Sequence, residues 1–156
     1  MAGSANTANY LSAVLEIEWQ GSTWIGRPLD SPFTPSDDLP QPEFLNIESV
    51  VITAWNPNGE ACSADENARR NLLLRDDLKE ARIEFFECLG RDESGQHFEE
   101  SFLTRCYYSH QTQAVLDLAR KYCQEAVFLI HGETRVLRFI GPEEKESRQV
   151  LQWEEA

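Results

Sequence analysis

The spacing of hydrophobic positions changes from segment to segment along the chain, and this spacing predicts the order of its elements. From residue 46 onward, apolar and β-branched runs of strand length alternate with two stretches in which apolar residues recur at helical spacing. Residues 10–19 fit a short helix that runs into a strand. We predict strands over 49–56, 82–89, 98–107, 125–130 and 136–140, and helices over 64–81 and 110–122.

This order of elements favours an α+β fold. The turn sequence Asp92-Glu93-Ser94-Gly95 joins two predicted strands into a hairpin, and Gly132 turns a second hairpin. Because two amphipathic helices interrupt the run of strands, they need an apolar surface to cover. We therefore predict a single-domain layer sandwich over residues 10–141, with a mainly antiparallel sheet and two principal helices packed on one face.

Three segments lack this patterning. Residues 1–9 are small and polar, so we expect a flexible N-terminal tail, and residues 142–156 are expected to form an acidic, solvated C-terminal tail. Five of the seven prolines lie within 28–42, which predicts an extended surface loop. A connection of this length is either mobile or a lid over a site, and both interpretations stay open.

A chain of 156 residues suits one domain with a single core. No apolar run approaches the roughly 20 residues of a membrane helix, and no export signal is present, so we expect a cytoplasmic protein without a membrane partner. The four cysteines form no Cys-x-x-Cys pair and the three histidines have no zinc-like spacing to them. We expect reduced thiols, no metal and no cofactor.

Charge narrows the range of partners. Twenty-seven acidic residues against fourteen basic ones give a formal net charge of -13, which repels phosphate backbones and argues against nucleic-acid binding. The acidity either serves solubility or presents an acidic surface to a basic protein partner. Composition alone does not decide between them.

A candidate site lies where the strand over 50–55 meets the next helix. Asn56-Pro57-Asn58-Gly59 stops the strand with strong turn chemistry, and Ser63 with Glu66 has the Ser-x-x-Glu pattern of a capping box. On the helix, Asn67 and Asn71 share the face of the core residues that follow them, so both amides need partners. They either brace the turn or, with Arg70 and helix N–H groups, hold an anionic ligand.

Further polar candidates lie on later strands. Glu99 and Ser101 alternate onto one face of a predicted strand, and Gln124 directly precedes the apolar strand 126–130. No recognised catalytic motif is present. If the protein is an enzyme, Glu99 is the best candidate for a general base, and Ser101 or Asn56 would position the substrate.

Four segments resemble a known family: Val51-Ile52-Thr53-Ala54-Trp55-Asn56-Pro57, Glu66-Asn67-Ala68-Arg69-Arg70-Asn71, Glu99-Glu100-Ser101-Phe102-Leu103, and Ala119-Arg120-Lys121-Tyr122-Cys123-Gln124-Glu125-Ala126-Val127-Phe128. They are similar to the bacterial domain-of-unknown-function family 3293 over about residues 50–139. The resemblance implies no activity. It implies that proteins of this family share the polar positions Asn56, Asn67, Asn71, Glu99, Ser101 and Gln124.

From these observations we expect a domain that binds a small polar or anionic ligand, such as a nucleotide-like metabolite, where strand 50–56 meets helix 64–81. Its expected ligand-binding residues are Asn56, Asn67, Arg70, Asn71 and Gln124. The alternative is an acidic interaction, inhibitor or regulatory protein without catalysis, with a basic protein as its partner. A third interpretation, a structural subunit, requires an exposed apolar patch, for which Tyr107, Tyr108 and Trp153 are the candidates.

Overall fold

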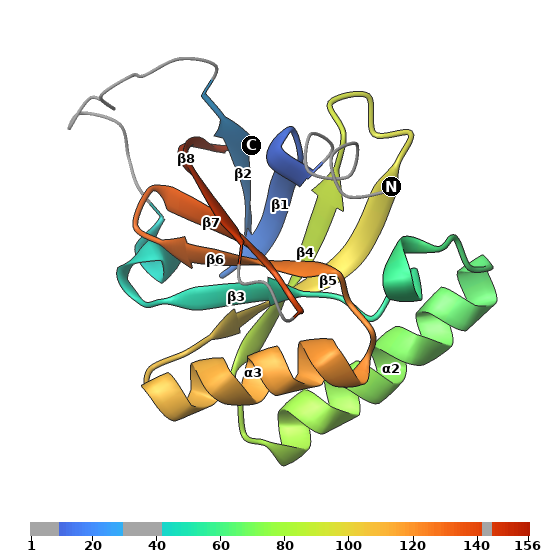
Figure 1. Cartoon of the computed structure of the whole chain (residues 1–156). Helices are drawn as coiled ribbons and strands as arrows, with labels where there is room; N and C mark the ends of the chain where they lie inside the picture. The colour runs from blue at the N-terminus through green and yellow to red at the C-terminus, as the bar shows by residue number, and fades with distance from the viewer. Residues whose placement is uncertain (1–9, 30–41, 142–144) are drawn as a thin grey trace.

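The strands of the chain close into an antiparallel barrel (Figure 1). The structure is a computed structural model that describes residues 10–29, 42–141 and 145–156. Around the barrel the strands follow the order β1-β2-β8-β7-β6-β3-β5-β4, and every neighbouring pair is antiparallel. The expected layer sandwich was therefore wrong, because the sheet has no free edges and encloses part of the core.

The described elements have these bounds: β1 (Val14–Trp19), β2 (Ser22–Pro28), η1 (Glu43–Asn46), β3 (Ser49–Ile52), η2 (Pro57–Gly59), α2 (Ala64–Glu80), β4 (Phe85–Arg91), β5 (Phe98–Arg105), α3 (Ser109–Lys121), β6 (Ala126–His131), β7 (Thr134–Phe139) and β8 (Glu146–Glu155).

Two strands that the hydrophobic pattern did not predict close the barrel. β2 pairs with β1 on one side and with β8 on the other, and β8 continues to β7. The expected acidic tail over 142–156 was therefore wrong for residues 146–155. Leu151 and Trp153 point into the core and are 1% and 2% exposed, while the acidic residues of β8 remain outside. Trp153 consequently cannot belong to an exposed apolar patch.

Local backbone chemistry explains how the closing strands fit. Gln20 and Gly21, both with positive φ, form a two-residue turn between β1 and β2, and such a turn matches the twist of a hairpin. Gly26 of β2 lies against the ring of Trp153, where an added Cβ would come within 2.8 Å of ring carbons. A side chain at Gly26 would therefore push the indole out of its place between β2 and the interior.

The core has two parts. One cluster fills the barrel and includes Leu15, Val51, Leu103 and Phe128, which alternate inward along their strands. The other lies between the outer barrel wall and the helices, where Val50 and Ile52 of β3 meet Leu74 and Val115. Both faces of β3 are buried, which explains its uninterrupted apolar sequence.

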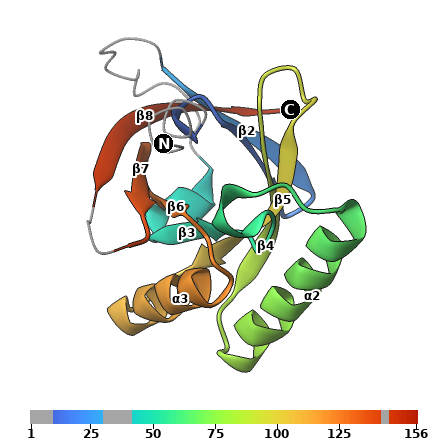
Figure 2. The same ribbon diagram turned by 45° about the vertical axis from the view of Figure 1, so that its right-hand side comes forward.

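Helices α2 and α3 cover the same side of the barrel (Figures 1 and 2). α3 contacts β3, β6 and α2. Ser63 caps α2 by accepting a hydrogen bond from the Glu66 N–H at 3.1 Å, as expected. The Glu66 carboxylate pairs with Arg69, so the reciprocal half of the expected capping box is replaced by an ion pair on the helix surface.

One end of the barrel is filled by aromatic side chains and the other end carries a hollow. Phe44 of η1 packs edge-on against Trp19 and Trp153, with ring centroids 5.8 and 5.5 Å apart. At the opposite end, where β6 begins, the helical turn at Tyr10 folds over the opening, and Tyr10 packs against Phe128. We call this second end the barrel mouth.

A buried arginine holds the turn that carries Tyr10. Arg135 is fully buried, and its guanidinium donates to the carbonyl oxygens of Ala13 and Leu11 at 2.8 and 3.2 Å and to Oε1 of Gln149 at 2.6 Å. It also stacks on the Phe128 ring at 4.3 Å. Burial lowers the pKa of Arg135 to about 9, which leaves it charged at neutral pH.

Some expectations fall on residues that the structure does not describe. They are the flexible tail over 1–9, most of the proline-rich loop over 28–42, and residues 142–144. All four cysteines are free thiols. Among the described helices, none combines the length and the apolar character needed to cross a membrane.

Candidate functional site

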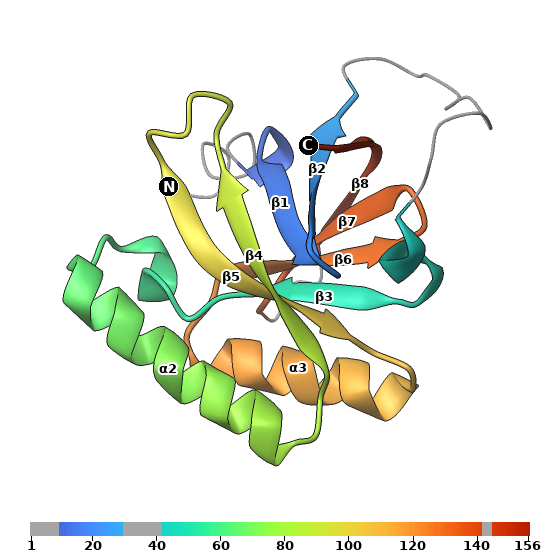
Figure 3. The same cartoon turned by 180° about the vertical axis from the view of Figure 1, so that it is seen from behind.

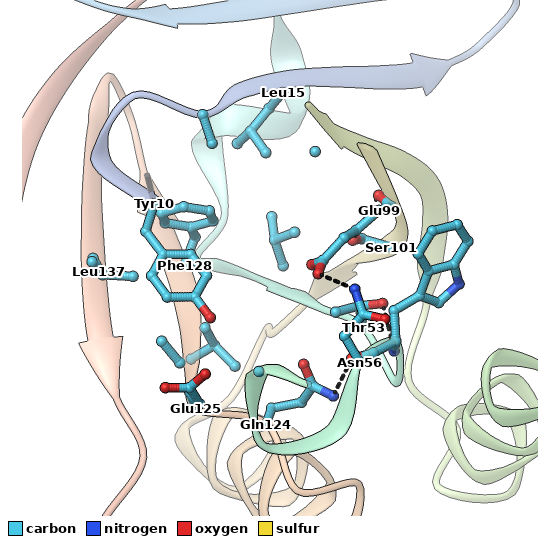
Figure 4. Close-up of a pocket in the computed structure, with 17 residues that line it drawn as sticks. Tyr10, Leu15, Thr53, Asn56, Glu99, Ser101, Gln124, Glu125, Phe128 and Leu137 are labelled. Atoms are coloured by element: carbon cyan, nitrogen blue, oxygen red, sulfur yellow. Dashed lines mark hydrogen bonds between the residues drawn. The ribbon is translucent and has the colours of Figure 1, made fainter. Parts of the chain in front are cut away.

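The barrel mouth contains a cavity of about 240 Å³. Polar side chains from β5 and from the turn after β3 form one wall, and aromatic side chains form the other (Figure 4). The polar or aromatic residues that line it are Tyr10, Thr53, Trp55, Asn56, Glu99, Ser101, Gln124, Glu125 and Phe128. The mouths of β-barrels are common places for small-molecule sites, because the strands fix side chains around a ready-made hollow.

Asn56 connects the turn to the cavity wall. It adopts a left-handed conformation with a φ of 48°, which Asn tolerates well, and this directs the chain into η2. Its Oδ1 accepts from the Cys62 N–H at 3.1 Å and from Nδ2 of Asn67 at 3.0 Å. Its Nδ2 donates to Oε1 of Glu99 at 3.2 Å. The turn therefore orients the carboxylate.

Glu99 is the principal charged group of the polar wall. It faces inward from β5, next to Gly90 of β4. Burial raises its pKa, and the hydrogen bond from Asn56 opposes that rise only in part. Among the described residues, Asn56 is the only side chain that donates to it, so Oε2 retains unused acceptor capacity toward the cavity.

Gln124 approaches the cavity from the segment between α3 and β6. Its Nε2 donates to the carbonyl oxygens of Trp55 and Tyr122 at 3.0 and 3.2 Å. The amide oxygen faces the hollow in Figure 4, and no described group donates to it. Gln124 therefore fastens one side of its amide to the strand end and presents the other side to the cavity.

The hydroxyls in the mouth are less available. Ser101 Oγ donates to the main-chain carbonyl of Glu99 at 3.3 Å, so it is not paired with the Glu99 carboxylate. Thr53 Oγ1 donates to the Glu100 carbonyl at 2.7 Å and accepts from the Trp55 N–H at 3.1 Å. Neither of these two hydroxyls donates to a side-chain base within the described part of the chain.

The electrostatics of the cavity are acidic. Glu99 and Glu125 both line it, and its described lining contains no lysine, arginine or histidine. Burial and the two carboxylates raise the pKa of Tyr10 to about 12, so its hydroxyl remains protonated at neutral pH. A ligand in this cavity would meet the Glu99 carboxylate on one side, and on the other side aromatic rings with Glu125 beside them (Figure 4).

Asn67, Arg70 and Asn71 lie behind the polar wall, outside the cavity lining. Asn71 accepts from the Ala54 N–H and donates to the Glu100 carbonyl, both at 2.8 Å. Asn67 accepts from the Asn56 N–H at 3.0 Å as well as donating to the Asn56 side chain. Arg70 donates to the carbonyls of Ala54 and Tyr122 at 2.7 Å each. These contacts are the bracing interactions weighed in the sequence analysis.

The sequence analysis missed Tyr10, Thr53 and Glu125 as lining residues. Thr53 could have been found, because it follows Val51 by two residues and therefore faces inward from the same strand end. Glu125 adjoins Gln124 at the start of an apolar strand. Nothing in the sequence relates Tyr10 to residues that lie more than 40 positions away, because the relation arises from barrel closure.

The described residues contain no cluster of three or more His, Cys, Asp or Glu side chains that could hold a metal ion.

Comparison with known proteins identifies a family and no activity. Residues 52–127 match the family described as "Protein of unknown function (DUF3293)", in agreement with the resemblance seen in the sequence. No curated protein matches the chain. The matched region contains Asn56, Glu99, Ser101 and Gln124, whereas the aromatic wall at Tyr10 and Phe128 lies outside it.

Proposed function

We propose that this protein, whose residues 52–127 belong to the DUF3293 family, binds a small organic cation in the mouth of its barrel. The observation that supports the proposal most strongly is the composition of one cavity. Glu99 lies across the hollow from Tyr10 and Phe128, Glu125 lies beside those rings, and the described lining contains no cationic side chain. Carboxylates and aromatic faces both attract organic ammonium and guanidinium groups.

The position of Glu99 supports a cation more strongly than an anion. Its carboxylate has unused acceptor capacity, so a bound N–H donor would complete its hydrogen bonding and compensate the buried charge. Arg70, the cation expected to hold an anionic group, donates to two main-chain carbonyls instead. A nucleotide-like ligand would bring phosphate charge next to two carboxylates, which disfavours that class.

The cavity size limits the ligand further. A volume of about 240 Å³ lies below the roughly 300–1,000 Å³ of sites that take drug-sized molecules. The proposed ligand is accordingly an amine, amidine or guanidine with a short apolar portion. Its cationic end would contact Glu99 and the amide oxygen of Gln124, and its apolar portion would lie against Tyr10 and Phe128.

A matched series of butylamine, butanol and butyrate tests this proposal, because the three compounds share an apolar portion and differ in their head group. Agmatine, phenethylamine and adenosine monophosphate extend the series. We expect amines and guanidines to raise the thermal midpoint of unfolding, with a stabilisation of about 2.7 kcal/mol at roughly 100 times the dissociation constant. The effect should be much smaller in Glu99→Gln at the same ligand concentration.

Two results would overturn the proposal. One is stabilisation by butyrate or adenosine monophosphate that equals or exceeds that by butylamine. The other is the absence of stabilisation by any compound in the series. Leu73→Gln is the matched control, since Leu73 is 45% exposed on α2 and does not line the cavity. Its ligand response should equal that of the wild-type protein.

General-base catalysis by Glu99 is a second candidate function. Burial raises the pKa of this carboxyl inside a cavity, and a raised pKa brings a carboxylate closer to the basicity that proton abstraction needs at neutral pH. Asn56 would keep it oriented, and Ser101 would line the substrate position. The test is deuterium incorporation at carbon in an amine that carries a carbonyl group next to that carbon, such as aminoacetone, followed by NMR in heavy water. Exchange in the wild-type protein that disappears in Glu99→Gln supports catalysis, and equal rates contradict it.

A further inference from the structure

A second concave surface lies on the outside of the barrel, independent of the mouth. It runs between α2 and the outer faces of β1, β4 and β5 and has a volume of about 460 Å³. We call it the α2 groove. Figure 3 shows α2 on the side of the barrel where β4 and β5 lie. Its charged strand residues, Glu16, Glu18, Glu87 and Glu100, alternate with inward-facing positions, so neither core cluster nor the proposed ligand site contains them. Cys88 and Phe102 of the core and Ser101 of the mouth also reach the base of the groove.

Apolar side chains are accessible in this groove. Leu72 is 62% exposed, the most exposed leucine among the described large hydrophobic residues, and it projects from α2 at the groove edge. Leu89 of β4 is half-buried, and the buried Phe102 lies at the floor, where the Arg75 guanidinium is 5.6 Å from the centre of its ring. A single exposed leucine is ordinary, but a leucine that borders a concave surface with an apolar floor can anchor a partner side chain.

The rim of the α2 groove is acidic. Glu16, Glu18, Glu87 and Glu100 line it against one guanidinium, that of Arg75. Arg91 pairs with Glu16 at 2.7 Å, and Arg75 pairs with Glu87 at 2.5 Å. Glu100 is exposed, and its carboxylate has no ion pair or hydrogen bond within the described part of the chain. The groove thus keeps negative charge that internal pairing does not neutralise.

We propose that the α2 groove is a docking site for a basic, leucine-bearing segment of a partner protein. Charge complementarity selects this occupant. A second copy of this chain would bring another formal charge of -13 to an acidic rim, and anionic membranes and nucleic acids would be repelled in the same way. An amphipathic segment with apolar anchors and flanking Lys or Arg matches both the floor and the rim.

Selection from a random peptide library against the full-length chain tests the docking site without knowledge of the natural partner. We expect enriched peptides to combine Leu, Ile, Met or Phe with Lys or Arg, and their binding to weaken as salt is raised. Leu72→Gln should weaken an enriched peptide roughly tenfold, as expected for the loss of an anchor residue. Glu100→Gln should weaken it roughly threefold, mainly through a slower association rate.

The controls separate this site from the barrel mouth. Leu73→Gln removes the same type of side chain, also exposed, from the next position of α2, outside the groove, and should leave peptide binding unchanged. Glu99→Gln should also leave it unchanged, so the failure of one proposal does not affect the other. The docking proposal is overturned if no peptide is enriched, if the enriched peptides lack basic residues, or if Leu72→Gln binds them as the wild type does. Sedimentation that shows a dimer broken by Leu72→Gln would assign the groove to a second copy and also overturn it.

Discussion

Asn67 and Asn71 on α2 and the polar groups of the barrel mouth look equivalent in sequence, yet the structure uses them differently. The side-chain oxygen and nitrogen of both asparagines form hydrogen bonds with neighbouring groups of the protein. Glu99 and Gln124 line the cavity, and each has one side-chain oxygen that accepts no hydrogen bond from the described residues. The two regions form one hydrogen-bond network. Asn67 and Asn71 at its back have all their side-chain groups bonded within the protein, whereas Glu99 and Gln124 at its front keep one free acceptor each among the described residues.

This difference shows why a polar side chain on a buried face is weak evidence for a ligand site. A buried amide must find partners, and main-chain groups at a strand end or a turn usually supply them. Unused hydrogen-bonding capacity next to a cavity is the more informative property. Variants of the two regions should therefore fall into two classes, one that changes stability and one that changes binding.

The largest expected effect is that of Asn71→Leu. The substitution leaves the Ala54 N–H without its partner and removes one of the two donors to the Glu100 carbonyl, and an unsatisfied buried group costs about 1–3 kcal/mol. We expect the free energy of unfolding, measured by urea denaturation, to fall by about 3 kcal/mol. Gln113→Leu on the exposed face of α3 is the control and should remain within about 0.5 kcal/mol of the wild type. Equal stability of the two variants would show that Asn71 is not a brace.

Glu99→Gln should change ligand binding and leave the fold intact, in contrast to Asn71→Leu. Losing a charge-assisted hydrogen bond worth about 1.5–3 kcal/mol should weaken amine binding about 10- to 100-fold, as measured by calorimetry. The fold should persist, because glutamine can still accept from Asn56. A variant that binds butylamine as the wild type does would remove Glu99 from the site.

The pH dependence of the same variant gives a second readout. Burial raises the pKa of Glu99, so the folded state holds this proton more tightly than the unfolded state. The resulting contribution to stability is fully present below the ordinary glutamate pKa of about 4.3 and is lost as pH rises through the raised pKa. We therefore expect Glu99→Gln to gain stability over the wild type as pH rises to neutral, in denaturation curves at a series of pH values. A constant difference would contradict the raised pKa.

A smaller effect is expected for Asp77→Asn, at the other end of α2. Lys121 and the Tyr122 hydroxyl donate to Oδ2 of Asp77 at 2.7 and 2.5 Å, and these hydrogen bonds lower the pKa of the carboxyl. The wild-type carboxylate therefore stabilises the fold above the ordinary aspartate pKa, and this contribution is lost as pH falls through the lowered value. Because Lys121 is largely exposed, we expect a loss of only about 0.5–1 kcal/mol at neutral pH. Amine affinity should not change.

Ser101→Ala should have the smallest effect. Its hydroxyl makes one weak bond to a main-chain carbonyl, so stability should change by less than about 1 kcal/mol and amine affinity by less than about fivefold. Thermal shift with and without butylamine measures both. A complete loss of binding would mean that Ser101, rather than Glu99, is the main contact.

The elements that could be predicted from the sequence are those with many apolar residues at a regular spacing. β3 to β7 and both helices have enough apolar positions at a regular period to be assigned from sequence, and their predicted bounds differ from those observed by a few residues. β2 and β8 present few apolar side chains inward, Trp24 in one strand and Leu151 and Trp153 in the other, among polar and charged neighbours. The barrel depends on those two strands, so the architecture could not be predicted without them.

The site was predictable in part for the same reason. Asn56, Glu99, Ser101 and Gln124 lie at strand ends or on an inward face, and local patterning is enough to select them. Tyr10 joins them only when β1 closes against β2 and β4. Whether Asn67 and Asn71 brace or bind depends on distances to the main chain of other segments, which no local pattern contains.

We propose that ligands contact Asn56 and Gln124 and not Asn67 and Asn71, and the side-chain amide signals in a ¹H–¹⁵N NMR titration with butylamine distinguish the two pairs. We predict that the NH₂ signals of Asn56 and Gln124 shift with increasing butylamine, that those of Asn67 and Asn71 stay in place, and that butyrate moves none of them. Larger shifts at Asn67 and Asn71 than at Asn56 and Gln124, or equal responses to butyrate, would contradict the account.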